Sequence, residues 1–158
     1  MNQTIEYRLN EATEEQLTNY LLKSSDDFIP PLSSRVEING YAKKIANNAI
    51  RFEAWSSSNL VGLVAVYCND LENHIAFITS VNVLTEWIGN GVAITLMSYC
   101  LEYMKGLGVK QINLEVAADN LPAIRLYEKS GFVWYNTKPP FITMRLYLKS
   151  GEEHELQA

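Results

Sequence analysis

Cysteine, clustered positive charge and long apolar runs are all scarce in this sequence of 158 residues. Its two cysteines, Cys68 and Cys100, are too few for a disulfide scaffold or a four-ligand zinc site. Both stand in apolar runs, which predicts buried thiols. No apolar run approaches the ~20 residues of a membrane-spanning helix, and the N-terminal stretch lacks the charged-then-apolar pattern of a secretory signal. We therefore expect a cytoplasmic protein with no membrane partner and no metal.

Positive charge is thinly spread along the chain. The formal net charge is −5, and Lys43 and Lys44 are the only adjacent basic residues. A nucleic-acid-binding face needs a basic stripe, so nucleic acid is not an expected partner. An acidic protein suits a cationic substrate such as an amine, although net charge bears mainly on solubility and on the rate of encounter.

No internal repeat and no linker rich in proline, glycine or serine divides the chain. Its length suits one domain. We predict a single domain over residues 1–150, followed by a polar C-terminal tail, "GEEHELQA", at residues 151–158.

Periodicity and turn residues predict the secondary structure. Thr13 and Gln16 have capping-box spacing at the start of a helix with Leu17, Tyr20 and Leu21 on one face. Strands are predicted at 4–9, 50–56, 60–68, 74–83, 109–116, 132–137 and 141–149, and helices at 13–22, 36–48, 92–105 and 120–131. The order β-α-α-β-β-β-α-β-α-β-β predicts an α/β fold with a mixed, mostly antiparallel sheet and helices on both faces.

Two glycines, Gly89 and Gly91, directly precede an apolar-periodic run in "EWIGNGVAITL". Three explanations are open: a tight turn, a helix packed hard on a neighbour, or a phosphate held by backbone amides. A helix N-terminus offers unpaired N–H groups and a partial positive charge, and glycine leaves room for a phosphate. A dinucleotide fingerprint is disfavoured because Ile94 replaces its third small residue. A P-loop is disfavoured because no Gly-Lys-Ser/Thr follows.

A second motif follows the glycine turn. Asn120, Ala123, Leu126, Tyr127 and the pair Gly131-Phe132 form the pattern Asn-x-x-Ala-x-x-Leu-Tyr-x-x-x-Gly-Phe. Together the two motifs resemble the GNAT family of N-acetyltransferases over about residues 76–133. The resemblance implies the acyl-CoA N-acyltransferase fold, with acetyl-CoA as cosubstrate and no metal.

The glycine turn departs from the family pattern at its first position. Members usually carry Arg or Gln where this chain has Ile88, a frequent lysine where it has Asn90, and a proline where it has Thr85. Backbone amides are donors whatever the sequence, so the turn retains its means of binding a pyrophosphate. The missing side chain implies weaker binding of the cosubstrate.

The resemblance also implies which residues bind the cosubstrate. It assigns the pyrophosphate to the backbone amides of Gly89, Asn90, Gly91, Val92 and Ala93. It assigns the pantetheine arm to the strand backbone at Val81, Asn82 and Val83, where the sheets of family members splay. Asn120 matches a pantetheine-contacting asparagine, and it is equally an N-cap of the following helix.

For the chemistry, Tyr127 matches the general acid that protonates the leaving thiolate, with a core tyrosine as the alternative. Glu115 aligns with a base of members that acetylate α-amines, with a solvated charge on a strand as the alternative. An ordinary glutamate has a pKa of ~4.3, so such a base needs burial or a water relay. Glu72 and His74 are weaker candidates for the base.

The resemblance also implies an acceptor pocket between the loop of residues 26–35 and the last hairpin. There, Asp26 and Asp27 are candidates for binding a cation, and four aromatic residues are candidates for its walls: Phe28, Trp134, Tyr135 and Phe141.

The expected function is transfer of an acetyl group from acetyl-CoA to a primary amine by direct attack in a ternary complex. The acceptor is a small molecule or a peptide, and the protein is a monomer or a homodimer. Ile88 and the lack of an obvious base leave a second hypothesis open, in which the chain is a catalytically silent acyl-CoA-binding or interaction module.

Overall fold

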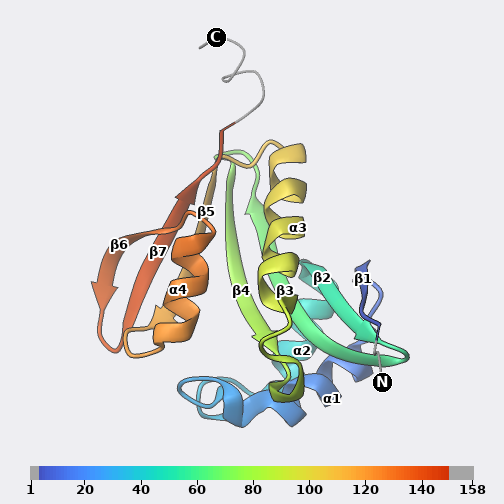
Figure 1. The fold of residues 1–158 in the computed structure, drawn as a ribbon. Coiled ribbons are helices and arrows are strands. Elements are labelled where there is room, and N and C mark those ends of the chain that lie inside the picture. Colours follow the sequence, from blue (N-terminus) through green and yellow to red (C-terminus); the bar gives the residue numbers. More distant parts are fainter. Residues whose placement is uncertain (1–3, 150–158) are drawn as a thin grey trace.

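The computed structural model describes residues 4–149, so the predicted tail at 151–158 lies outside the described residues. The chain forms a seven-stranded sheet in the order β1-β2-β3-β4-β5-β7-β6 (Figure 1). The pair β4–β5 is parallel and the other pairs are antiparallel. The mixed, mostly antiparallel sheet with helices on both faces is therefore confirmed.

The elements follow the predicted order. The strands are β1 (Glu6–Leu9), β2 (Ala49–Ser56), β3 (Asn59–Asp70), β4 (Ile75–Val83), β5 (Gln111–Ala117), β6 (Val133–Lys138) and β7 (Phe141–Tyr147). The helices are α1 (Glu14–Ser24), α2 (Ile38–Asn48), α3 (Val92–Gly106) and α4 (Leu121–Lys129). The observed ends of the elements differ from the predicted ends by at most two residues. At the start of β4, His74 lies in the preceding turn with a positive φ of 60°, so the strand begins one residue later than predicted.

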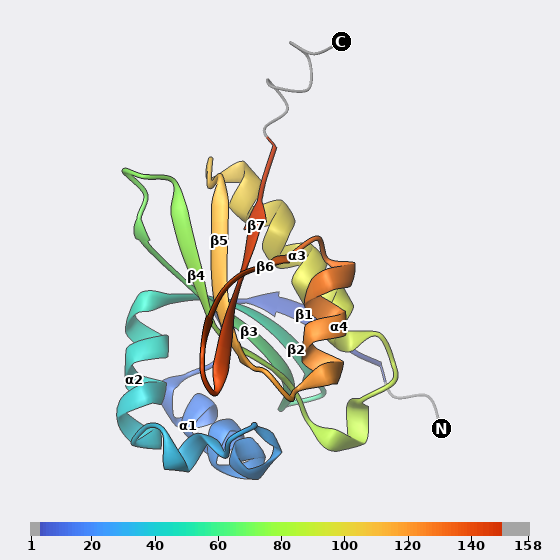
Figure 2. The same cartoon turned by 90° about the vertical axis from the view of Figure 1, so that its left-hand side faces the viewer.

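The helices are divided between the two faces of the sheet. Figure 2 shows α1 and α2 on one side and α3 and α4 on the other. The capping box of α1 is present, with the Thr13 hydroxyl accepting from the Gln16 amide at 3.1 Å. Its predicted apolar face, Leu17, Tyr20 and Leu21, is buried. None of the helices within residues 4–149 combines the length and apolarity needed to cross a membrane.

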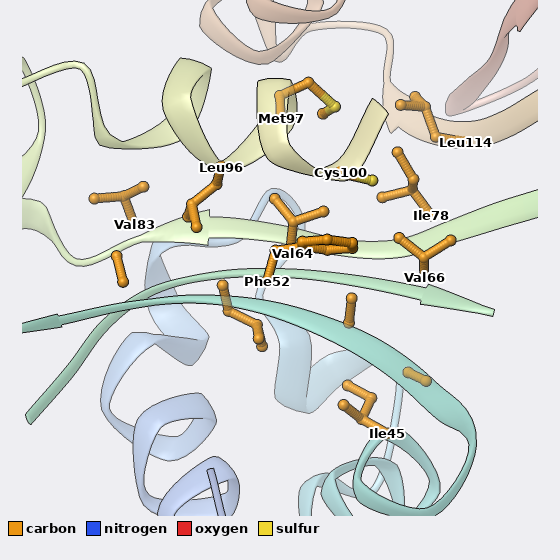
Figure 3. Close-up of a cluster of buried hydrophobic side chains, with 14 of the residues drawn as sticks. Ile45, Phe52, Val64, Val66, Ile78, Val83, Leu96, Met97, Cys100 and Leu114 are labelled. Atoms are coloured by element: carbon orange, nitrogen blue, oxygen red, sulfur yellow. The ribbon is translucent and has the colours of Figure 1, made fainter. Parts of the chain in front are cut away.

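The main core lies between α3 and the middle of the sheet. Figure 3 shows Leu96 and Cys100 of α3 directed at the sheet, with Ile45 of α2 on the opposite face. The thiol of Cys100 is buried as predicted, whereas Cys68 is only half-buried. Gly62 of β3 allows α3 to approach, because a Cβ built there would lie 3.1 Å from Leu96 Cδ1.

The sheet splays along the parallel pair of strands. Only Ile75–Ile78 of β4 pair with Gln111–Leu114 of β5. Beyond them, the rest of β4 pairs only with β3, and the rest of β5 pairs only with β7. Figure 1 shows the two strands adjacent at one end and apart at the other. The backbones of residues 79–83 and 115–117 thus border an opening in the sheet.

Candidate active site

The glycine turn has room for a ligand. Gly89 and Gly91 have φ values of 92° and 74°, a left-handed conformation that favours glycine. A Cβ built at Gly89 would meet no atom within 4 Å, and one at Gly91 would meet only Ile94 Cγ2 at 4.0 Å. Hard helix packing therefore does not account for these glycines. The tight turn does account for them, and the space beside them is open.

The N-terminus of α3 presents unpaired amides at this turn. Gly91 is the N-cap and supplies no side-chain hydrogen bond, and the first hydrogen bond of the helix runs from the Thr95 amide to the Gly91 carbonyl. The amides of residues 92–94 therefore lack an intrahelical acceptor, and the helix dipole adds partial positive charge.

A hollow of about 510 Å³, here called the turn hollow, lies against these amides. Its walls include the turn glycines and the exposed side chain of Ile88. Two basic side chains from α4, Arg125 and Lys129, line the same hollow. These two residues were not predicted from the sequence, although their i, i+4 spacing places them on one face of a helix.

A second hollow, of about 150 Å³, lies in the splay between β4 and β5 and is here called the splay hollow. Five residues to which the family resemblance gives a role line it together: Glu115, Asn120, Tyr127, Val81 and Asn82. Val83 lines the turn hollow instead, together with Gly89, Gly91, Val92 and Ala93. Asn90 lines neither hollow, and its side chain donates to the Trp87 carbonyl at 3.2 Å. The other predicted cosubstrate residues divide between the two hollows, and β4 contributes to both.

Tyr127 is buried, with 6% of its surface exposed, and its ring packs edge-on against Phe132. Burial raises the pKa of its phenol well above the usual value, so the group stays protonated at neutral pH. No hydrogen bond within residues 4–149 involves its hydroxyl. The alternative reading as a core aromatic describes its packing, but the residue also lines the splay hollow.

Glu115 is exposed on β5 and lines the splay hollow. A glutamate can act as a base here if it is buried or if it accepts the proton through a water molecule. Because Glu115 is exposed, only the route through water remains. Glu72 and His74, the weaker candidates, are exposed in the turn before β4, and neither lines this hollow.

Asn120 is the N-cap of α4, which is one of the two roles expected for it. Its Oδ1 accepts from the Ala123 amide at 3.4 Å, at the start of α4. Because this bond uses only the oxygen, the side-chain amide nitrogen can still donate toward the splay hollow, which Asn120 lines.

The acceptor side of the splay hollow is only partly as predicted. Asp27, Phe28 and Phe141 line it. Asp26, Trp134 and Tyr135 do not, and all three are exposed. Arg35 lines it as well, with its guanidinium carbon 5.3 Å from the centre of the Phe141 ring.

Two tyrosine hydroxyls, one from α1 and one from α2, donate hydrogen bonds to the backbone of β4, and neither bond was predicted from the sequence. Tyr20 donates to the Asn82 carbonyl at 2.9 Å, and Tyr41 donates to the Thr79 carbonyl at 2.8 Å. Near them, Ser80 Oγ and Asn82 Nδ2 are buried without a partner in the described part of the chain. Unpaired buried polar atoms are costly, so this strand is suited to a ligand that supplies partners.

A family model described as "Acetyltransferase (GNAT) family" matches residues 13–132. Among curated proteins, N-alpha-acetyltransferase 30 from Schizosaccharomyces pombe is 36% identical over 59 residues, which cover 37% of this chain and 39% of that protein. The match therefore spans well under half of that relative.

Solved structures share the fold over nearly the whole chain. PaiA N-acetyltransferase from Thermoplasma acidophilum, in complex with coenzyme A, has a TM-score of 0.72 and 16% identity, covering 92% of this chain and 99% of that one. The ribosomal-protein-S18-alanine N-acetyltransferase from Escherichia coli has a TM-score of 0.73 and 19% identity, covering 94% of this chain and 97% of that one.

Proposed function

Because this chain belongs to the acetyltransferase (GNAT) family, we propose that it transfers the acetyl group of acetyl-CoA to a primary amine by direct attack in a ternary complex. The observation that carries the proposal is the splay hollow, where Glu115, Asn120 and Tyr127 meet the free edge of β4. A silent binding module has no need of a protonated phenol and a carboxylate in one cavity, so the enzyme is the better hypothesis.

The residues present fit acetyl-CoA. The unpaired amides at the start of α3 and the open space at Gly89 and Gly91 suit a pyrophosphate. Arg125 and Lys129 offer the positive charge that Ile88 does not. The free edge of β4 and the side-chain nitrogen of Asn120 suit the amide groups of a pantetheine arm.

Acetyl-CoA supplies the thioester carbonyl, and the protein supplies the groups that move protons. The attacking amine must first lose a proton, because its ordinary pKa, ~8 for a peptide α-amine and ~10 for a lysine side chain, keeps most of it charged at neutral pH. Exposed Glu115 accepts that proton through water and passes it to solvent. As the new C–N bond forms and the C–S bond breaks, Tyr127 donates its proton to the departing sulfur, and the nitrogen gives up its second proton, which restores the phenol of Tyr127. Atoms and charge then balance, with the acetylated amine and free CoA thiol as products.

The α-amine of a peptide is the first acceptor to test. The curated relative is named as an N-alpha-acetyltransferase, and one structural relative is named for a protein alanine. The splay hollow is also small, at about 150 Å³, and suits the end of a chain rather than a bulky acceptor.

The test is release of free thiol from acetyl-CoA in the presence of peptide N-termini, lysine side chains, amino sugars and aminoglycosides. Turnover with peptide α-amines, confirmed by a mass increase of the peptide, is the expected result. Turnover with only one of the other amine classes would identify that class as the acceptor in place of peptide α-amines. Tight binding of acetyl-CoA without turnover of any amine would support the silent module instead.

A further inference from the structure

Beyond the splay hollow, the outer faces of β5 and β7 carry an arginine that no carboxylate neutralises. Within residues 4–149, no carboxylate oxygen lies within 4 Å of a nitrogen of Arg145. The side chain is nevertheless fixed in place. Its Nε donates to Asn113 Oδ1 at 2.8 Å, its Nη1 donates to the Tyr147 hydroxyl at 3.4 Å, and its guanidinium carbon lies 3.4 Å from the centre of the Tyr135 ring.

These contacts orient the guanidinium and leave part of it free. An arginine has five N–H donors, and two of them are used here. The Nη2 group makes no hydrogen bond within the described residues. A planar fork stacked on an aromatic ring is suited to bind a carboxylate through two parallel bonds, and it loses little side-chain freedom when it does so.

Arg145 lies on the same face of the sheet as Glu115. Arg145 pairs with Asn113 in the β5–β7 ladder, and Glu115 is two residues further along β5. Side chains two apart on a strand share a face and lie about 7 Å apart along it. Glu115 and Tyr147 are exposed and Asn113 and Arg145 are half-buried, so the path between the two sites is open to solvent.

We propose that Arg145 binds a carboxylate of the acceptor, so that the preferred substrates are peptides with an acidic side chain at the second or third residue. This inference rests on the proposed acetylation of peptide α-amines. An extended peptide advances ~3.3–3.6 Å per residue, so a peptide whose amine lies beside Glu115 carries its second or third side chain to Arg145.

The experiment uses pairs of tetrapeptide amides with Glu or Gln at position two or three, because amidation removes the C-terminal carboxylate. The parent protein should acetylate the better Glu peptide with a kcat/KM roughly tenfold or more above that of its Gln partner, the usual effect of a hydrogen-bonded ion pair. Arg145→Gln should abolish this preference, because the rate on the Glu peptide should fall at least about tenfold more than the rate on the Gln peptide. Arg145→Lys should keep part of it.

Lys110→Gln is the matched control, because it removes one exposed positive charge just before β5 without touching these contacts. It should keep the preference for Glu. Equal rates on Glu and Gln peptides in the parent, or an unchanged preference in Arg145→Gln, would overturn the inference while leaving the proposed function intact.

Calorimetric binding of the same peptides in the presence of CoA separates the two proposals. If no peptide is acetylated, the proposed function fails for peptides, and binding still tests Arg145. Tighter binding of Glu peptides to the parent, lost in Arg145→Gln, supports the carboxylate site. Equal binding of both peptides to the parent overturns it.

Discussion

The hydroxyl of Tyr20 donates a hydrogen bond of 2.9 Å to the backbone carbonyl of Asn82, which is 62 positions later in the chain. The bond joins α1 to the part of β4 that has left β5. Tyr20→Phe should therefore lower the free energy of unfolding by about 1–2 kcal/mol, because it leaves a part-buried carbonyl without its donor. Urea denaturation measures this loss. Tyr99→Phe, which alters an exposed ring on α3, is the control and should change little.

A second prediction concerns alkaline pH. Burial raises the pKa of Tyr20, and it raises the pKa of Tyr41 to about 12. The folded state therefore holds these protons at pH values where the unfolded chain, with phenols near ~10, releases them. Stability should be fully present below about pH 10 and fall as the pH rises toward 12. Urea denaturation between these values should give a shallower fall for Tyr41→Phe, and superimposable profiles would contradict this account.

The role of Gly91 in binding acetyl-CoA can be tested by comparing its substitution with that of Gly108, which has a similar backbone conformation. Gly91 and Gly108 both have positive φ, at 74° and 81°, and both have open space where a Cβ would lie. Substitution of either by alanine should cost similar stability, about 1 kcal/mol. Acetyl-CoA at ~100 times its Kd should raise the Tm of the parent by roughly 5–10 °C. Gly108→Ala should keep this shift and Gly91→Ala should lose most of it, and an equal shift in both would assign the turn a purely structural role.

Tyr127→Phe should lower kcat by about 10²-fold, the lower end of the usual contribution of a general acid. The ring and its contact with Phe132 remain, and the hydroxyl has no bond to lose within the described residues. The Tm and the affinity for acetyl-CoA should therefore stay close to those of the parent. Parent-like turnover would make Tyr127 a core aromatic, and loss of folding would make its hydroxyl structural.

Glu115→Gln should lower turnover most at low pH, where few acceptor amines are uncharged and a relay for the proton matters most. We expect a loss of roughly tenfold or more near pH 6 and a smaller one near pH 9. Glu128→Gln removes an exposed carboxylate of α4 that does not line the splay hollow, and it serves as the control. Matching pH profiles for Glu115→Gln and parent would leave Glu115 as a solvated charge.

The order of the elements was predictable because each one carries a local signal. Thr13 and Gln16 mark the start of α1, and the alternation of Ile112, Leu114 and Val116 marks β5. These signals act within a few residues, so one sequence is enough to detect them. His74 was misplaced because its left-handed backbone is set by the turn that it closes, and histidine has no strong preference there.

The parts of the site that were missed depend on contacts between distant residues. Nothing near Tyr20 or Tyr41 in the sequence indicates that their hydroxyls reach β4, because the chain must first fold α1 and α2 onto the sheet. Gly62 resembled an ordinary strand residue, and its close contact with α3 exists only after packing. Motif resemblance identified Asn120 and Tyr127 because the family pattern is local, and it gave no information on Arg125 or Arg145.

The four residue pairs that join β4 to β5 also have a mechanical consequence. The pairing between β4 and β5 ends at Ile78 and Leu114, and no backbone hydrogen bonds join the two strands beyond these residues. A force that pulls the two halves of the sheet apart therefore acts mainly on this last pair. An extended ligand that hydrogen-bonds to the free backbone of both strands would resist their separation. A ligand bound there would therefore stiffen the protein, and its removal would soften the protein without altering a covalent bond.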